Sequence, residues 1–171
     1  MVRANAGSGP AKRRDLRMSA PPEQSFPDGL IISPAQPQDL ATIMRIDTEH
    51  TGKEKRDYWQ ACYERSNTDH NTTFLVAHLD GEVVGCALGA IQAWEFGSPP
   101  CGWIQAMYVS IDQQGKHIAN RLFDSLVAQF RAAGITTVRT MLHIDNHMLM
   151  SFFRMQGMAA GPYIELEMQA E

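Results

Sequence analysis

Apolar residues recur along this chain with a helical period in some stretches and as short β-prone runs in others. One row of apolar residues stands four apart from Ile118 to Phe130, and a second row beginning at Ala119 runs beside it. This spacing predicts a helix over about 118–130. The runs 30–32, which Ser33-Pro34 closes, 73–79, 82–88 and 103–109 predict strands. Between the second and third of these runs stands Asp80-Gly81, which is the signature of a tight hairpin.

The remaining elements follow from the same patterns. Helical spacing from Leu40 to Asp47 predicts a helix that opens near Pro37, and Thr51-Gly52 ends it. A second helix is predicted from about Glu54 to the polar run ending at Asp69. Three further elements complete the chain: a strand at 137–144, a helix at 146–155 and a last strand at 163–168. The order β-α-α-β-β-β-α-β-α-β predicts one α/β domain over residues 29–171.

Residues 1–28 differ in composition from the rest of the chain. They are rich in Gly, Ala, Ser and Pro, and they lack apolar periodicity. A segment of this kind buries too little apolar surface to offset its ordering entropy, so we predict a flexible tail. The basic triplet Lys12-Arg13-Arg14 leaves open a second interpretation, in which the tail docks on a protein partner.

Composition narrows the class of protein. The 171 residues, with 44% hydrophobic and 20% charged residues, are typical of a globular domain. A formal net charge of −4 argues against nucleic acid as a partner. No apolar run approaches the about 20 residues of a membrane helix, and no signal peptide stands out. The three cysteines and six histidines show no zinc-type spacing. We therefore expect a cytoplasmic protein with reduced thiols and without a metal or a membrane partner.

The connection between residues 103 and 130 carries the strongest chemical signal. A predicted strand ends at Val109, and a short polar segment with Gly115 and Lys116 leads into the predicted helix. The unpaired N–H groups of a first helical turn, together with the helix dipole, form a seat for phosphate. The alternative is an ordinary strand-to-helix connection.

Two motifs in this order resemble the GNAT superfamily of N-acetyltransferases over about residues 30–168. The first is the phosphate loop Gln/Arg-x-x-Gly-x-Gly/Ala, which stands here as Gln114 to Ala119 after Val109. The second is an Asn followed by an aromatic pair and Gly with an apolar residue, here Asn146, Phe152-Phe153 and Gly157-Met158. The resemblance implies a mixed central sheet with a splayed pair of parallel strands, flanked by helices.

The resemblance also implies where acetyl-CoA, the cosubstrate, binds. The pantetheine arm pairs with the strand at Met107, Tyr108 and Val109, and Asn146 and Phe153 lie beside the cosubstrate. The pyrophosphate lies on the N–H groups of the loop. The loop residues are Gln114, Gly115, Lys116, His117, Ile118 and Ala119. A strand N–H can also stabilise the oxyanion that develops on the thioester.

Three residues depart from the family pattern. His117 replaces the second glycine of the phosphate loop, where a Cβ can obstruct the approach of phosphate. Phe153 stands where many members carry a tyrosine that acts as general acid. Gln105 stands where many carry a glutamate base, and an amide is no base near neutral pH. The two commonest catalytic side chains of the family are therefore absent.

Other side chains are candidates for the missing base. Glu95 lies between two aromatic residues, which would raise its pKa if the carboxylate is desolvated. His143, on the predicted strand 137–144, titrates near neutral pH. The alternatives are a solvated loop carboxylate and a partly exposed strand histidine. Glu49 and His50 lie where the family builds its substrate wall, and we assign them to specificity.

The sequence thus predicts an acetyl-CoA-dependent N-acetyltransferase acting on a primary amine, either a small molecule or a peptide. A non-catalytic acyl-CoA-binding module is the alternative, because Gln105 and Phe153 lack the usual acid and base chemistry. A domain that only binds proteins through its basic tail is a third interpretation. The resemblance leaves room for a homodimer.

Overall fold

Five strands form one sheet in the computed structural model, which describes residues 26–94 and 97–170. Their order across the sheet is their order along the chain. The strands are β1 (Leu30–Pro34), β2 (Thr72–Leu79), β3 (Glu82–Gln92), β4 (Cys101–Val109) and β5 (Val138–Thr140). Strands β1 to β4 pair antiparallel, whereas β5 pairs parallel to β4. The predicted mixed sheet with one parallel pair is confirmed.

Within the described residues, four α-helices and the 3-10 turns η1 and η3 connect these strands. The helices are α1 (Leu40–Thr51), α2 (Arg56–Thr68), α3 (Ile118–Ala132) and α4 (His147–Met155). The turn η1 (Pro37–Asp39) leads into α1, and η3 (Ile111–Gln113) follows β4. Asp80 and Gly81 both have positive φ, 52° and 88°, which is the conformation of the tight turn that their sequence predicts.

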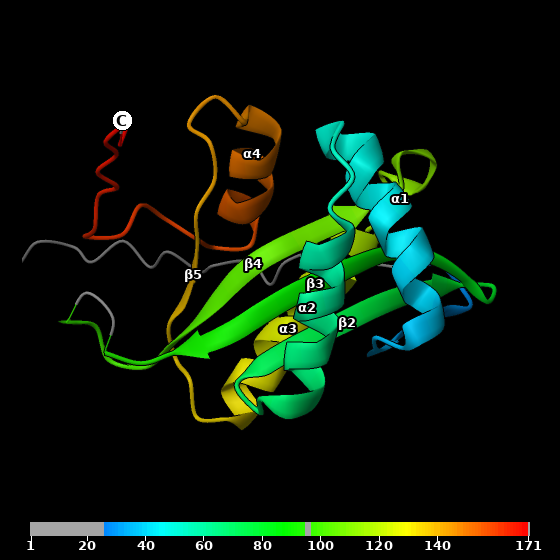
Figure 1. Ribbon diagram of the computed structural model, residues 1–171, viewed down its shortest axis with the longest axis horizontal. Coiled ribbons are helices and arrows are strands. Elements are labelled where there is room, and N and C mark those ends of the chain that lie inside the picture. The colour runs from blue at the N-terminus through cyan, green and yellow to red at the C-terminus, as the bar shows by residue number, and fades with distance from the viewer. Residues whose placement is uncertain (1–25, 95–96, 171) are drawn as a thin grey trace, which may run out of the picture.

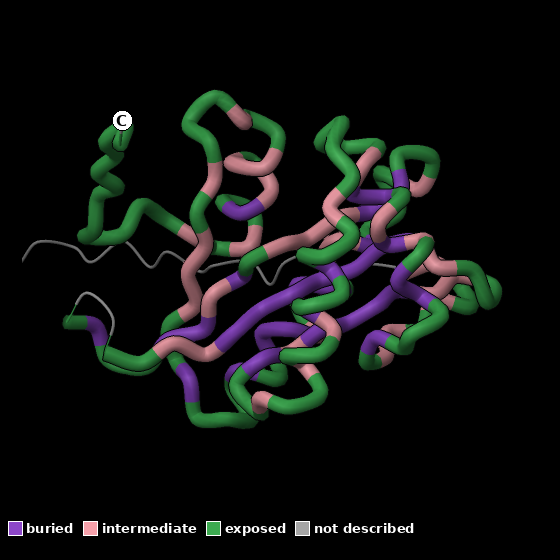
Figure 2. The backbone as a smooth tube through the Cα atoms, viewed as in Figure 1, coloured by how far each residue is buried: buried purple, intermediate pink, exposed green. Residues whose placement is uncertain are grey.

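The helices cover both faces of the sheet, as Figure 1 shows with α1 and α2 in front of the strands and α3 behind them. One buried cluster joins α3 to the sheet through residues such as Leu122, Leu126 and Ile104. The other joins α1 and α2 to the opposite face through residues such as Ile43 and Trp59. The buried stretches of β2 and β3 lie between these clusters (Figure 2). Burial on both faces fixes the central strands in register.

Gly102 sets how closely α3 approaches β4. A Cβ built on this glycine would lie 2.4 Å from the Phe130 ring of α3. The fully buried Phe130 therefore lies directly on the β4 backbone. This contact holds α3 against the strand that precedes it in the chain.

Two predicted strands differ from the structure. The strand predicted at 137–144 ends at Thr140, and residues 163–168 form no strand. Ile164, Leu166 and Met168 are instead exposed. Alternating apolar residues indicate a strand, but a strand also needs a neighbouring edge to accept its hydrogen bonds. No such pairing forms for 163–168 within the described chain.

The tail predicted over residues 1–28 lies outside the described residues as far as residue 25. In the described ranges, no helix combines the length and the apolar character needed to cross a bilayer.

Candidate active site

Strands β4 and β5 separate after three paired positions, from Gly102 opposite Val138 to Ile104 opposite Thr140. In Figure 1, β5 and the segment after it run away from the second half of β4. The pairing of β4 with β3 shifts register at the same level, between Leu88 and Gly89. An extra residue of this kind bends a strand and increases its twist. The far half of β4, 105–109, therefore has no strand neighbour on its β5 side within the described chain.

The hydrogen bonds of β4 show which backbone groups face this open edge. The N–H of Ser110 donates to Val84 in β3, at 2.9 Å. Because successive residues of a strand direct their polar groups to opposite sides, Met107 and Val109 face away from β3. The backbone of Tyr108 is opposite Cys86 in β3. Of the three predicted strand contacts, Met107 and Val109 thus offer backbone groups to a ligand at the open edge.

The loop after β4 presents unpaired donors. The N–H groups of Gln113, Gln114 and Arg121 donate hydrogen bonds to backbone carbonyls. The N–H groups of 115–120 have no acceptor within the described chain. Gly115 and His117 have φ values of 81° and 59°. These left-handed conformations turn the backbone into the first turn of α3, where N–H groups and the helix dipole favour an anion. The N–H groups of 115–120 are thus free of partners within the described chain where the sequence predicts the pyrophosphate seat.

His117 adopts a conformation that glycine usually supplies. A non-glycine residue in the left-handed region costs about 1–3 kcal/mol. His117 is an exposed residue. The neighbouring Lys116 is also exposed, and its Nζ donates to Gln113 Oε1 at 2.8 Å. The side chains of Lys116 and His117, one cationic and one titratable, both lie at the rim of the loop.

Helix α4 places the other two predicted contacts. Asn146 caps the helix, because its Oδ1 accepts the N–H of Leu149 at 3.1 Å. This bond leaves the Asn146 amide N–H₂ available as a donor. Phe153 is only 6% exposed and packs against Phe123 of α3, with ring centroids 6.3 Å apart. The ring at the usual tyrosine position is therefore part of the hydrophobic core.

Of the two predicted catalytic residues the structure describes His143, whereas Glu95 lies outside the described residues. His143 stands three residues beyond β5 and its side chain is 76% exposed, so the prediction that it lies on the strand 137–144 is wrong. Its Nδ1 accepts the N–H of Asp145 at 3.2 Å. Gln105 is exposed on β4.

A buried polar cluster that the sequence did not lead us to expect lies between α1, α2 and β4. Asp47 has no exposed surface, and its carboxylate accepts from Lys55 Nζ and Trp59 Nε1, each at 2.8 Å. Burial, and next the charge of Asp47, raise the pKa of the Tyr108 phenol well above its ordinary value. Burial raises the pKa of Tyr58 to about 12. The sequence feature that could have revealed this cluster is Asp47 itself, because it is an acidic residue at a core-facing position of the helical repeat.

His50 is the residue of α1 that reaches β4. Its Nε2 lies 2.8 Å from the carbonyl oxygen of Val109, and its ring is 5.6 Å from that of Tyr108. The family resemblance implied that His50 belongs to the substrate wall. Its hydrogen bond to Val109 joins residues that are 59 positions apart, so no local pattern in the sequence predicts it.

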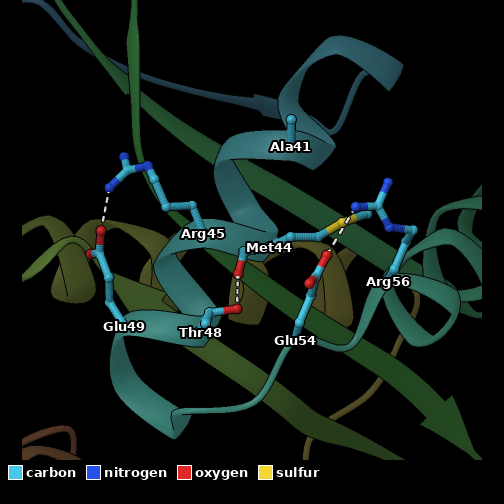
Figure 3. A pocket seen from close by; sticks show the side chains of 7 residues that line it. All are labelled: Ala41, Met44, Arg45, Thr48, Glu49, Glu54 and Arg56. Atoms are coloured by element: carbon cyan, nitrogen blue, oxygen red, sulfur yellow. Dashed lines mark hydrogen bonds and ion pairs between the residues drawn. The ribbon is translucent and has the colours of Figure 1, made fainter.

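The outer face of α1 carries a separate groove of about 480 Å³, drawn in Figure 3. Its carboxylates are paired: Glu49 with Arg45, and Glu54 with Arg56 at 2.9 Å. Figure 3 shows these pairs on opposite sides of the groove. They leave no uncompensated charge there for a ligand. In the described residues, no group of three His, Cys, Asp or Glu side chains is placed to hold a metal.

Solved structures share this architecture. A transcriptional regulator from Bacillus halodurans C-125 is 15% identical, with 82% of this chain and 99% of that chain covered and a TM-score of 0.70. An aminoglycoside acetyltransferase, AAC(6')-Iy, in complex with a bisubstrate analogue of CoA and acetylneamine, is 13% identical over 82% and 98%, with a TM-score of 0.71. A ribosomal-protein-alanine N-acetyltransferase from Brucella melitensis is 17% identical over 82% and 99%, with a TM-score of 0.67.

These identities establish a shared fold and leave the acceptor open, since the three proteins carry different descriptions. No curated protein matches the sequence. Residues 40–158, which include α1, the open edge of β4, the phosphate loop and α4, match the acetyltransferase (GNAT) family. The chain therefore belongs to the GNAT acetyltransferase family.

Proposed function

We propose that this chain is an N-acetyltransferase that transfers the acetyl group of acetyl-CoA directly to a primary amine. The observation that carries the proposal is the continuity of two unpaired surfaces. The open edge of β4, 105–109, leads through the short turn η3 to the loop 114–119, in which the N–H groups of 115–119 lack partners within the described chain. An extended ligand with amide groups along its arm and a pyrophosphate at its end fits both surfaces.

The backbone supplies the binding groups for the arm. Met107 and Val109 face the open edge, so a pantetheine arm adds to β4 as an extra strand would. The Val109 carbonyl already accepts from His50, which leaves its N–H for the arm. The Asn146 amide donates from the opposite side of the opening. These groups hold the thioester in one place. The entropy of orienting the reactants is then lost when acetyl-CoA binds and not during the reaction, and this lowers the activation barrier.

The N–H of Met107 is the candidate oxyanion donor. It faces the same edge as Val109, two residues nearer the point where β4 and β5 separate. A backbone donor fixed by the sheet stabilises charge that develops on the thioester oxygen without reorganising during the reaction. When bound, acetyl-CoA supplies the activated acetyl group. The protein contributes position, a donor for the oxygen and exclusion of competing water.

A second candidate function is acyl-CoA binding without turnover. It is favoured by Gln105, which is no base, and by Phe153, which is no acid and lies in the core. The two functions share the cosubstrate site and differ in whether an amine is acetylated.

Two measurements separate these functions. Calorimetric titration with acetyl-CoA tests the shared site, and we expect saturable binding. Release of free CoA thiol is then followed with neamine, spermidine and a peptide with N-terminal alanine as acceptors. Thiol release that depends on an added amine supports the acetyltransferase. Binding without release from any of the three acceptors supports the binding module, and absence of binding overturns both functions.

A further inference from the structure

His50 is anchored at the open edge of β4 by the last turn of α1. Its Nε2 is 2.8 Å from the Val109 carbonyl oxygen. The Tyr108 ring lies beside the imidazole, with centroids 5.6 Å apart and planes inclined by 35°. A hydrogen bond on one side and an aromatic neighbour on the other define the orientation of the ring.

The hydrogen bond also defines which nitrogen carries the proton. A carbonyl oxygen only accepts, so Nε2 must be the donor. In the neutral imidazole the other nitrogen, Nδ1, then carries a lone pair and accepts protons. His50 is an exposed residue, and no hydrogen bond within the described chain occupies this nitrogen.

The position of His50 relative to Met107 matters for catalysis. Met107 and Val109 face the same edge and are two residues apart, a distance of about 6.6 Å along a strand. An amine that attacks a thioester held at the Met107 N–H is therefore separated from the imidazole by a gap that is too long for direct proton transfer. One bridging water can carry the proton across this gap.

The neighbouring titratable groups are unsuited to this task. The raised pKa of Tyr108 keeps its phenol protonated at neutral pH. The Asp47 carboxylate is buried and engaged by Lys55 and Trp59. Glu49, the residue before His50, is paired with Arg45 on the outer face of α1.

We propose that His50 is the general base of the acetyl transfer, an inference that rests on the proposed function. The amine nitrogen forms a bond to the acetyl carbon, and Nδ1 of His50 takes one N–H proton through a bridging water. The carbon–sulfur bond breaks, and its electron pair stays on sulfur. The imidazolium returns the proton through water to the thiolate. The products are the acetylated amine and CoA thiol, with neutral His50 restored.

The test compares two substitutions at one position. His50→Gln keeps an amide N–H₂ at the place of Nε2, so it retains the bond to Val109 but has no basic nitrogen. His50→Ala removes both. We expect kcat to fall about 100-fold or more in both variants, the range typical of a lost general base. We expect the Kd of acetyl-CoA to stay within about threefold in His50→Gln. His70→Gln, which replaces an exposed histidine in the turn between α2 and β2, is the matched control with unchanged kcat.

Each result decides the proposal. If His50→Gln turns over like the wild type while His50→Ala does not, the role of His50 is only to hydrogen-bond the Val109 carbonyl, and the proposal is wrong. If acetyl-CoA binds more tightly to both variants and kcat is retained, His50 competes with the arm for the carbonyl and the proposal is again wrong. The acceptor is whichever of neamine, spermidine and the alanine peptide gives the highest wild-type rate.

Nitrogen NMR of the wild-type protein gives a readout that is independent of turnover. The His50 ring signals, assigned by their loss in His50→Gln, should show a protonated Nε2 and an unprotonated Nδ1 at neutral pH. The opposite tautomer would overturn the proposal. Failure of the proposed function is distinguishable, because the wild type would then release no thiol with any of the three amines.

Discussion

Lys55 Nζ lies 2.8 Å from Asp47 Oδ1, so the carboxylate of a fully buried residue meets an ammonium whose side chain is one-third exposed. The second carboxylate oxygen accepts from the buried Trp59 indole at 2.8 Å. This arrangement connects α1, the following loop and α2. Because α1 also carries His50, the cluster sets where the imidazole meets β4.

Asp47→Ala should therefore destabilise the fold. The substitution leaves the Trp59 N–H buried without an acceptor and Lys55 without its partner, and we expect a loss of about 2–4 kcal/mol in the free energy of unfolding. Urea titration followed by tryptophan fluorescence measures this loss. The control is Glu54→Ala, which breaks an exposed pair with Arg56 and should change stability by less than about 0.5 kcal/mol. Equal effects of the two substitutions would contradict this role for Asp47.

Gly102→Ala should also destabilise the protein, for a steric reason. The new Cβ would lie 2.4 Å from a Phe130 ring that has no free space to move into. Overpacking of this kind costs about 1–3 kcal/mol, and it should lower the midpoint of thermal unfolding. Gly161→Ala is the matched control, since nothing lies within 4 Å of the corresponding Cβ and its φ is not positive. A midpoint unchanged in Gly102→Ala would show that α3 can withdraw from β4 at little cost.

Much of the fold could be predicted from local patterns in the sequence. The row of apolar residues four positions apart, from Ile118 to Phe130, lies on α3. Asp80-Gly81 forms the turn of the hairpin between β2 and β3. The parallel pair of strands was implied by the family resemblance. The helix and the hairpin depend on periodicity and turn chemistry, which are visible in neighbouring residues.

The parts that could not be predicted depend on contacts between distant residues. The bond of His50 to Val109 and the burial of Asp47 arise only when α1 packs on the sheet. The segment 163–168 has the alternation of a strand, but it pairs with no strand in the described chain. His143 was assigned to a strand because its neighbours are apolar, yet Met141 and Ile144 are exposed.

Cys86 should be unreactive in the folded protein at mildly alkaline pH. It is fully buried, and desolvation raises the pKa of its thiol to about 12. At pH 8 the thiolate fraction is then about 1 in 10,000, and the thiolate is the nucleophile. Labelling with a thiol reagent, monitored by peptide mass, should modify Cys86 only after addition of denaturant. Labelling of the native protein at the rate of the unfolded one would contradict this burial.

Stability should fall as the pH rises above about 9. The folded state keeps the protons of Cys86, Tyr108 and Tyr58 because their pKa values are raised. The unfolded chain loses these protons near the ordinary pKa values of thiols and phenols, so it binds fewer protons and is favoured. Each group contributes a slope of at most about 1.4 kcal/mol per pH unit between its unfolded and folded pKa.

Urea titrations at pH 8, 9 and 10 would measure this slope, and Cys86→Ala should reduce it between pH 9 and 10. The alanine variant has no titrating thiol at this position. The packing that it loses lowers the free energy of unfolding equally at every pH, so this loss does not change the slope of stability against pH. Identical slopes in the two proteins would contradict the assignment to Cys86.

His117→Gly should stabilise the protein and preserve cosubstrate binding. His117 has a φ of 59°, where glycine carries no steric cost. Relief of the strain offsets the greater freedom of glycine in the unfolded chain, and we expect a net gain of about 0.5–1 kcal/mol. Removing the Cβ also clears the approach to the N–H groups at the start of α3. The Kd of acetyl-CoA, measured by calorimetry, should therefore stay equal or decrease.

Lys116→Gly provides the comparison for this prediction. Lys116 does not have a positive φ, so glycine there relieves no strain and should cost about 0.5–1 kcal/mol. The opposite signs of the two effects would assign the gain in His117→Gly to backbone conformation. If both substitutions destabilise the protein, the imidazole of His117 makes a contribution that outweighs its left-handed backbone.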